Sequence, residues 1–217
     1  VVPATALVKV PRHLDAVQAA SLPCAALTAW HAVTAAAIKP GDVVVTQGTG
    51  GVSLFALQFA KLMGATVIVT SSSEAKLARA RALGADLGID YRRDPEWHKL
   101  VREASAGRGA DLVIELGGAG TLDQSLRAVR VSGTVALIGV LAGGLAKLDL
   151  GRVVTQNLRL QGVTIGSRDM FEAMMRAIAT HRLIPAIDDH VYGFDEAPAA
   201  IAAIARGEHF GKICIKF

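Results

Sequence analysis

The chain has 217 residues and a net charge of +4, and apolar residues make up 52% of it while charged residues make up 19%. A chain of this length and composition can bury one full core and part of a second, which excludes a disordered protein. No basic run is interleaved with aromatic residues and no apolar run is long enough to span a bilayer, so we expect neither nucleic-acid nor membrane partners.

The first forty residues predict two helical pieces followed by a turn. Residues 14–21 form a short amphipathic piece, and Pro23 breaks the pattern before a helix of small residues over 25–37. We expect this second helix to pack closely against its neighbour. Residues 40–42, with the sequence Pro-Gly-Asp, are typical of a turn.

Residues 43–70 have the pattern of one strand–helix–strand unit. Residues 43–47 are a continuous β-branched run, which is typical of a strand that is buried on both faces. A Gly-rich turn leads into a helix over 52–63, which ends before Gly64, and residues 66–70 form the next buried strand. About thirty residues is the size of one such unit.

Strands and helices continue to alternate up to residue 165. We expect helices over 73–83, 96–105 and 121–129, and strands over 87–90, 111–115, 134–141 and 158–165. This alternation predicts an α/β fold, in which a Rossmann-type, doubly wound parallel sheet carries helices on both faces. The strand over 158–165 comes last, so it should lie at an edge of the sheet.

The last fifty residues break this alternation. They predict a helix over 170–181, an extended segment over 187–192, an Ala-rich helix over 195–206 and a half-exposed strand over 212–217. Together with residues 1–30, this tail predicts part of a second, smaller domain.

The turn between the first strand and its helix has the sequence Gly48-Thr49-Gly50-Gly51-Val52-Ser53. A dinucleotide pyrophosphate needs a tight turn, close backbone approach and free N–H groups at a helix start. Gly48 can supply the turn, and Gly50 removes the side chain where the phosphate must lie. Ser53 stands at the third glycine position of the fingerprint. We predict that residues 48–52 bind the pyrophosphate; the alternative is a Gly turn without a ligand.

The end of the second strand determines which ribose is accepted. An acidic residue there binds the ribose hydroxyls and repels a 2′-phosphate, but this chain has Ser71, Ser72 and Ser73, followed by Lys76. The acid nearby, Glu74, begins the next helix, where it favours the helix dipole, and one of the serines can serve as the N-cap. We therefore predict a preference for NADP(H), with NAD(H) as the alternative.

Stretches at residues 22–30, 41–45, 48–53, 60–65, 83–86 and 209–215 together resemble the medium-chain dehydrogenase/reductase superfamily, which includes zinc alcohol dehydrogenases and zinc-free quinone oxidoreductases. Members are usually half as long again, so the resemblance implies a fragment that lacks most of the N-terminal, GroES-like catalytic domain. Residues 1–30 would then be the edge of that domain, 31–168 the dinucleotide-binding domain, and 169–217 the return into the catalytic domain.

The resemblance also implies roles for single residues. Ser71 stands where NAD-dependent members carry their ribose-binding acid, and Lys76 and Tyr91 match positions that contact the 2′-phosphate. Lys212 matches a basic residue that reaches the pyrophosphate; the alternative for Tyr91 and Lys212 is a surface side chain. The residues expected beside the nicotinamide are Gly117, Gly139, Val140 and Ile165.

The two cysteines, Cys24 and Cys214, are far apart in sequence, so we expect no disulfide and a cytoplasmic protein. In the zinc alcohol dehydrogenases the position of Cys24 holds a zinc ligand. Zinc needs three protein ligands, and the cysteines and histidines here have no such spacing. We therefore expect no metal within this chain and a small, buried packing residue at Cys24.

The leading hypothesis is an NADP(H)-preferring oxidoreductase, or its cofactor-binding portion. It would transfer hydride between the nicotinamide and a small-molecule alcohol or carbonyl, quinone or activated alkene. No residue is assigned as catalytic, and we expect this chain alone to be inactive. The alternative is a non-catalytic dinucleotide-binding module. We further expect a homodimer through the strand over 158–165; the alternative is an edge that the chain's own C-terminal segment shields.

Overall fold

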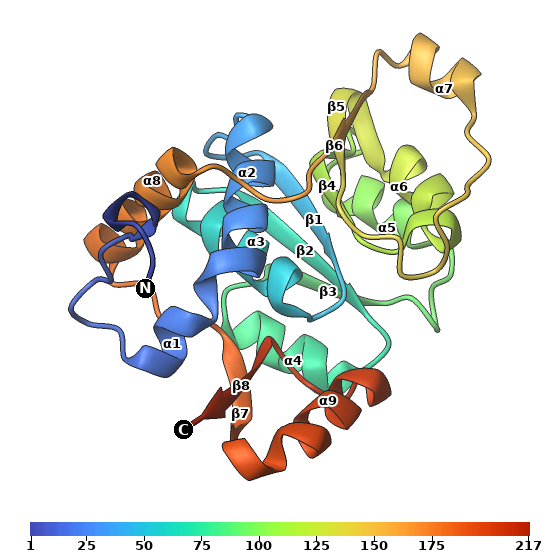
Figure 1. Ribbon diagram of the computed structural model, residues 1–217. Coiled ribbons are helices and arrows are strands. Elements are labelled where there is room, and N and C mark those ends of the chain that lie inside the picture. Colours follow the sequence, from blue (N-terminus) through green and yellow to red (C-terminus); the bar gives the residue numbers. More distant parts are fainter.

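A six-stranded parallel sheet forms the centre of the computed structural model, which describes residues 1–217 (Figure 1). The strands lie in the order β3-β2-β1-β4-β5-β6, and every neighbouring pair is parallel. This confirms the predicted Rossmann-type sheet. The strands are β1 (Val43–Gln47), β2 (Thr66–Ser71), β3 (Leu87–Asp90), β4 (Ala110–Glu115), β5 (Val129–Leu137) and β6 (Arg159–Gly162).

Helices cover both faces of the sheet, because alternate residues of the buried strands point to opposite sides. Val44 of β1 belongs to one apolar core, together with Phe55 and Phe59. Val45 belongs to the other, together with Trp97. The helices are α2 (Leu27–Ala35), α3 (Gly51–Leu62) and α4 (Glu74–Ala82) on the first side, and α5 (Trp97–Ala104) and α6 (Leu122–Ala128) on the second.

The C-terminal residues form a smaller unit. Strands β7 (Ile187–Gly193) and β8 (Lys212–Lys216) form a separate parallel pair, which is joined by α9 (Ala197–Arg206). The N-terminal helix α1 (Ala16–Ala20) lies against β8, and α8 (Arg168–His181) packs against α2 (Figure 1). The arrangement brings the two ends of the chain together, while the predicted domain boundaries stay a prediction.

Two predicted strands differ from the structure by more than one residue. The predicted strand over 134–141 is wrong at both ends, because β5 begins at Val129 and passes through Gly133, where its register with β4 shifts between Ala110 and Leu112. It ends at Leu137, since the N–H groups of Ile138 and Gly139 both turn to the carbonyl of Glu115. The strand predicted over 158–165 is also wrong in its bounds. The observed strand β6 covers only Arg159–Gly162, because it loses its partner where β5 ends.

Apart from shifts of one or two residues at helix ends, the helices differ from the prediction in two respects. Pro23 does not break the helix, because it lies in the first turn of a short π-helix (Leu22–Ala26) that runs directly into α2, and proline is tolerated there. A short helix that the sequence analysis did not predict, α7 (Leu150–Thr155), interrupts the long connection between β5 and β6. The side chain of Asp149 caps it by accepting a hydrogen bond from Arg152 N–H.

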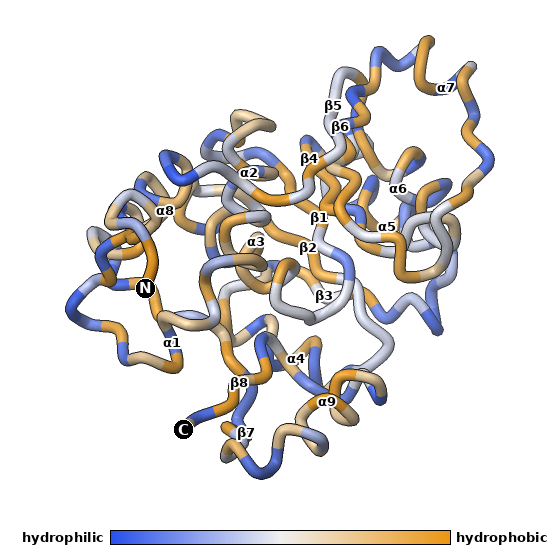
Figure 2. The backbone as a smooth tube through the Cα atoms, in the orientation of Figure 1, coloured by the Kyte–Doolittle hydropathy of each residue, from blue (hydrophilic) through white to orange (hydrophobic).

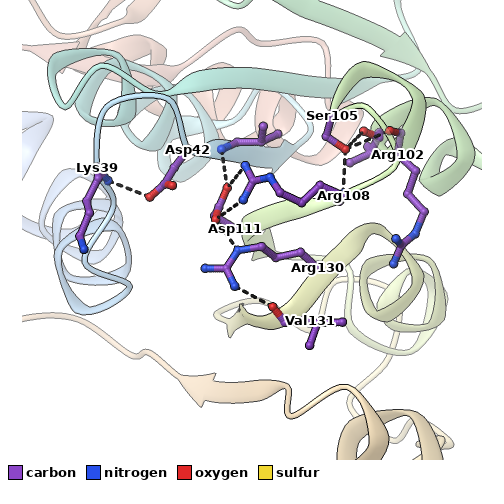
Figure 3. Close-up of polar contacts among 11 residues, drawn as sticks. Lys39, Asp42, Arg102, Ser105, Arg108, Asp111, Arg130 and Val131 are labelled. Atoms are coloured by element: carbon purple, nitrogen blue, oxygen red, sulfur yellow. Dashed lines mark hydrogen bonds and ion pairs between the residues drawn. The ribbon is translucent and has the colours of Figure 1, made fainter.

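A buried carboxylate fixes the amino-terminal edge of the sheet (Figure 3). Asp111 of β4 accepts hydrogen bonds from the Val43 N–H at 2.8 Å and from the guanidinium groups of Arg108 and Arg130. Burial alone would raise the pKa of the Asp111 carboxyl, but these hydrogen bonds outweigh it and lower the pKa from 3.8 to about 2. Asp111 thereby connects the start of β1 to β4 and β5.

Hydrophobic residues follow the central strands (Figure 2). Apolar stretches also occur outside the core, along the segment that carries α7 and projects from the body of the molecule (Figure 2). None of the helices has both the length and the hydropathy that crossing a membrane would need.

Candidate functional site

A pocket of about 480 Å³ lies at the carboxyl ends of β1, β2 and β4. In this strand order the chain leaves β1 and β4 in opposite directions, and in open α/β sheets ligands bind in the crevice at that switch point. We call this pocket the switch-point crevice. Its lining includes Gln47, Gly48, Tyr91, Leu116, Gly117 and Thr121.

The glycines of the Gly-rich turn differ in whether the fold itself requires a glycine. Gly48 has a φ of +74°, which favours glycine, and its N–H donates to Thr70 O at 2.7 Å. A Cβ at Gly51 would lie 2.5 Å from the Lys212 side chain. A Cβ at Gly50, whose φ is negative, would meet nothing within 4 Å. The fold itself does not require glycine at position 50, so the open space there is available to a ligand.

The same turn presents unused hydrogen-bond donors. The backbone N–H groups of Thr49, Gly50 and Val52 donate no hydrogen bond within the protein, and they lie at the N-terminus of α3. Ser53 is fully buried and its hydroxyl donates to Gln47 O, which holds the helix start against the end of β1. Free donors at a helix N-terminus, beside open space, are what an anionic group such as a phosphate requires.

The C-terminal unit reaches this turn. Gly211 N–H donates to Thr49 O at 2.9 Å, and Gly50 and Gly211 form an isolated β-bridge. This places the stem of Lys212 against Gly51. The structure therefore brings Lys212 to the turn from the far end of the chain, and its contact with the pyrophosphate stays a prediction.

The residues predicted at the ribose end are only partly brought together. Tyr91 lines the crevice, is 43% exposed, and its N–H donates to Ser71 O at 3.1 Å. Ser71 is buried at the end of β2, Ser72 is half-buried beside it, and Ser73 caps α4. Lys76 points elsewhere, because its ammonium donates to Gly207 O at 2.5 Å.

Charge around these residues is already paired. Burial lowers the pKa of Lys76, partly offset by the nearby charges of Asp188 and Glu208. Glu74 forms an ion pair with Arg81, and the Asp90 carboxylate accepts a hydrogen bond from Arg92 N–H at 3.0 Å. β2 itself ends at Ser71, and the neighbouring strand β3 places Asp90 beside it.

The residues predicted beside the nicotinamide fall into two groups. Gly117 lines the crevice, and Gly139 packs on the backbone of Leu116, so the segments after β4 and β5 lie side by side. Val140 follows Gly139 and is exposed. Ile165 is separate, since its carbonyl lies 2.6 Å from Nδ1 of His31 on α2.

Sequence reasoning missed a buried polar cluster beneath the crevice. Glu115 ends β4, Gln47 ends β1, and their side chains are hydrogen-bonded to each other and to Thr121 and Ser125. The sequence does contain a signal for each residue. Gln47 and Glu115 are polar residues at the ends of otherwise apolar strands, and a glycine follows each within two residues. Only the strand order shows that the two ends are adjacent.

The cysteines and histidines do not assemble into a metal site. The structure contains no group of three or more His, Cys, Asp or Glu residues that could hold a metal ion. The expectation that Cys24 is a buried packing residue is wrong, because its position in the first turn of the π-helix leaves it exposed. Cys214 is buried, which raises the pKa of its thiol.

Comparison with known proteins gives a consistent set of relatives. The sequence profile described as zinc-binding dehydrogenase matches residues 51–180. A zinc-type alcohol dehydrogenase-like protein of Schizosaccharomyces pombe is 39% identical over 223 aligned residues, which cover 100% of this chain and 64% of that protein.

Two solved structures share the fold. An NAD-dependent alcohol dehydrogenase is 32% identical with a TM-score of 0.91, and the match covers 100% of this chain and 63% of that one. The 2-octenoyl-CoA carboxylase reductase CinF, in complex with NADP and 2-octenoyl-CoA, is 29% identical with a TM-score of 0.92, over 99% of this chain and 52% of that one. The chain thus spans less than two thirds of each of these three relatives.

Proposed function

The chain belongs to the zinc-binding dehydrogenase family of the medium-chain dehydrogenase/reductase superfamily, and we propose that its switch-point crevice holds the nicotinamide dinucleotide of an oxidoreductase. The observation that carries this proposal is the Gly-rich turn, where three N–H groups have no partner in the protein and a Cβ at Gly50 would meet nothing within 4 Å. The relatives support it, because one is named NAD-dependent and another is solved with NADP.

The residues present fit such a cofactor. The N–H groups of Thr49, Gly50 and Val52 would bind the pyrophosphate, and the Lys212 ammonium would add a positive charge beside them. Ser71 and Ser72 would face the adenosine ribose. When bound, the nicotinamide ring donates or accepts hydride, while this chain binds and orients the cofactor. The reaction partner would be an alcohol or carbonyl, a quinone or an activated alkene.

The residues of this chain do not fit a zinc ion. Cys24 has no second and third ligand near it, whereas a protein zinc site needs at least three. The role that we propose for this chain is therefore cofactor binding.

Within this proposal NADP(H) is the preferred cofactor. Hydroxyl groups, and no acid, end β2 at Ser71, and Tyr91, whose N–H donates to Ser71 O, lines the crevice. A 2′-phosphate would meet hydroxyl donors there, and the Asp90 carboxylate beside Ser71 is paired with Arg93. Lys76 can contribute only after its ammonium leaves Gly207 O.

Titration of the chain with NADPH and with NADH, followed by nicotinamide fluorescence at one salt concentration, tests the preference. We expect tighter binding of NADPH; equal or reversed affinities would contradict it. Lys76→Ala should weaken NADPH binding by about 1 kcal/mol, because in the wild type the ammonium exchanges its hydrogen bond to the Gly207 carbonyl for one to the charged phosphate. The affinity for NADH should not change. Arg81→Ala, on the same helix but paired with Glu74, is the matched control.

A homodimer through β6 is part of the same proposal. β6 pairs with β5 alone and leaves its other edge open, and β8 pairs with β7, so the C-terminal segment does not take that edge. The neighbouring segment that carries α7 projects from the body of the molecule (Figure 2). Its exposed side chains include Leu141, Leu145, Leu150 and Val154. Pairing of the same edge in a second copy would extend the sheet and cover these side chains.

A further inference from the structure

Glu115, the last residue of β4, is a carboxylate that is completely buried and forms no ion pair. Five neutral donors surround it instead. Oε1 accepts hydrogen bonds from the N–H groups of Gly117 and Gly118, both at 2.9 Å, and from the Thr121 hydroxyl. Oε2 accepts from Nε2 of Gln47 at 2.7 Å and from the Ser125 hydroxyl. A buried carboxylate is retained only when its oxygens are satisfied in this way.

The Gln47 side chain completes the arrangement from the other side of the switch point. Its Oε1 accepts from Leu116 N–H at 2.9 Å and from Gly117 N–H at 3.2 Å, which fixes the orientation of the amide. Its Nε2 then faces Glu115 and Ser125. Gln47 lines the crevice and Glu115 lies beneath it, so this contact joins the ends of β1 and β4 at the point where the chain diverges.

The segment after β5 is attached to the same residue. The backbone carbonyl of Glu115 accepts from Ile138 N–H at 3.0 Å and Gly139 N–H at 3.2 Å. Farther along, Leu141 N–H donates to Leu116 O, and Ala142 N–H donates to Gly117 O. The ends of three strands, β1, β4 and β5, therefore meet at one side chain and its own carbonyl.

The two walls of the crevice differ as a result. In the wall after β4, the N–H groups of Leu116, Gly117 and Gly118 are all bonded, and the carbonyls of Leu116 and Gly117 are bonded as well. The backbone N–H groups of these three residues are therefore not available to a phosphate. At the Gly-rich turn, by contrast, the N–H groups of Thr49 and Gly50 are free.

We propose that Glu115 is a positioning residue that, through Gln47 and the Gly117 loop, fixes the saturated wall of the crevice against which a ring of the dinucleotide lies. The inference rests on the proposed function. Glu115 does not line the crevice, so it acts through the residues that do. Its loss would free loop donors and change the separation between the ends of β1 and β4.

Three variants test the arrangement of donors and acceptors. In Glu115→Gln, an amide NH₂ group faces either the Gln47 NH₂ group or the Gly117 and Gly118 N–H groups, so donors oppose donors. In Gln47→Glu, two carboxylates face each other. The double variant Gln47→Glu/Glu115→Gln exchanges the two groups, which have equal length, and restores an acceptor opposite every donor.

Each variant is titrated with NADPH and unfolded in urea. Without urea, where the variant is folded, we expect Glu115→Gln to weaken NADPH binding about tenfold or more. We expect the double variant to recover most of the affinity. Asp111→Asn is the matched control. It removes another buried carboxylate from the same strand, at the far end of the sheet, so it should lower stability and leave NADPH affinity unchanged.

The outcomes separate the two proposals. A wild-type chain that binds neither NADPH nor NADH overturns the proposed function and this inference with it. A wild-type chain that binds, with Glu115→Gln of unchanged affinity, overturns this inference alone. So does an affinity loss in Asp111→Asn as large as in Glu115→Gln. If Glu115→Gln does not fold, Ser125→Ala, which removes one donor to Oε2, replaces it; about threefold weaker binding supports the proposal, and unchanged binding overturns it.

Discussion

Gly50→Ala separates what the fold needs from what the ligand needs. The added Cβ meets nothing within 4 Å, and Gly50 has a negative φ at the N-cap of α3. Alanine restricts the unfolded chain, which stabilises the protein by about 0.4–1 kcal/mol, and it is a poorer N-cap by a similar amount. The two effects oppose each other, so the free energy of unfolding should change by less than about 0.5 kcal/mol.

Cofactor binding should change much more. The Cβ occupies the space where a phosphate would approach the free N–H groups of Thr49, Gly50 and Val52. A hydrogen bond to a charged group contributes about 1.5–3 kcal/mol, so the loss of one weakens NADPH binding about tenfold to a hundredfold.

The assay combines urea unfolding with titration of NADPH by fluorescence. Gly144→Ala is the control, since its Cβ also meets nothing within 4 Å but it lies in the loop after β5. It should bind NADPH as the wild type does. A folded Gly50→Ala chain with wild-type affinity would refute the assignment of the turn.

Two further predictions concern stability and assembly. The folded pKa of Asp111, about 2, lies below its ordinary 3.8, so its contribution of about 2 kcal/mol is present above pH 4 and is lost as the pH falls through 2. Asp111→Asn should therefore lower the free energy of unfolding at pH 7 by about 2 kcal/mol. Between pH 4 and 2 the free energy of unfolding should fall less in the variant than in the wild type; pH profiles that run parallel in the two proteins would disprove the prediction. In β6, Val163 N–H donates to Leu137 O, so the N–H of Gly162 points to the open edge, and Gly162→Pro should convert a dimer to monomers in light scattering. A wild-type monomer, or a folded variant that stays dimeric, would exclude this interface.

The sequence predicts the sheet well where local pattern and tertiary environment agree. Residues 43–47 are found as β1 with the same bounds, because a continuous β-branched run suits a strand that is covered on both faces. Gly133 misled the prediction, since a glycine before a β-branched run resembles a turn. In the structure it lies within β5, where a Cβ would press on the backbone of Arg130 and Ala110.

The site was predictable only in its local part. The Gly-rich turn is contiguous, so its glycines could be assigned from spacing and strand–helix context. Lys76 is close to Ser71 in sequence, yet the carbonyl of Gly207, 131 residues away, holds its ammonium. Glu115 and Gln47 are 68 residues apart, and only the pairing of β1 with β4 brings them together. Contacts of this kind are set by strand order, which local patterns do not contain.

Hydrogen–deuterium exchange with and without NADPH tests the central claim most directly. The amides of Thr49, Gly50 and Val52 have no partner in the protein and should exchange fast in the free chain. The account predicts that saturating NADPH slows exchange in peptides covering residues 48–53, while peptides from α9 (Ala197–Arg206) are unaffected. Binding of NADPH without protection of residues 48–53 would contradict it.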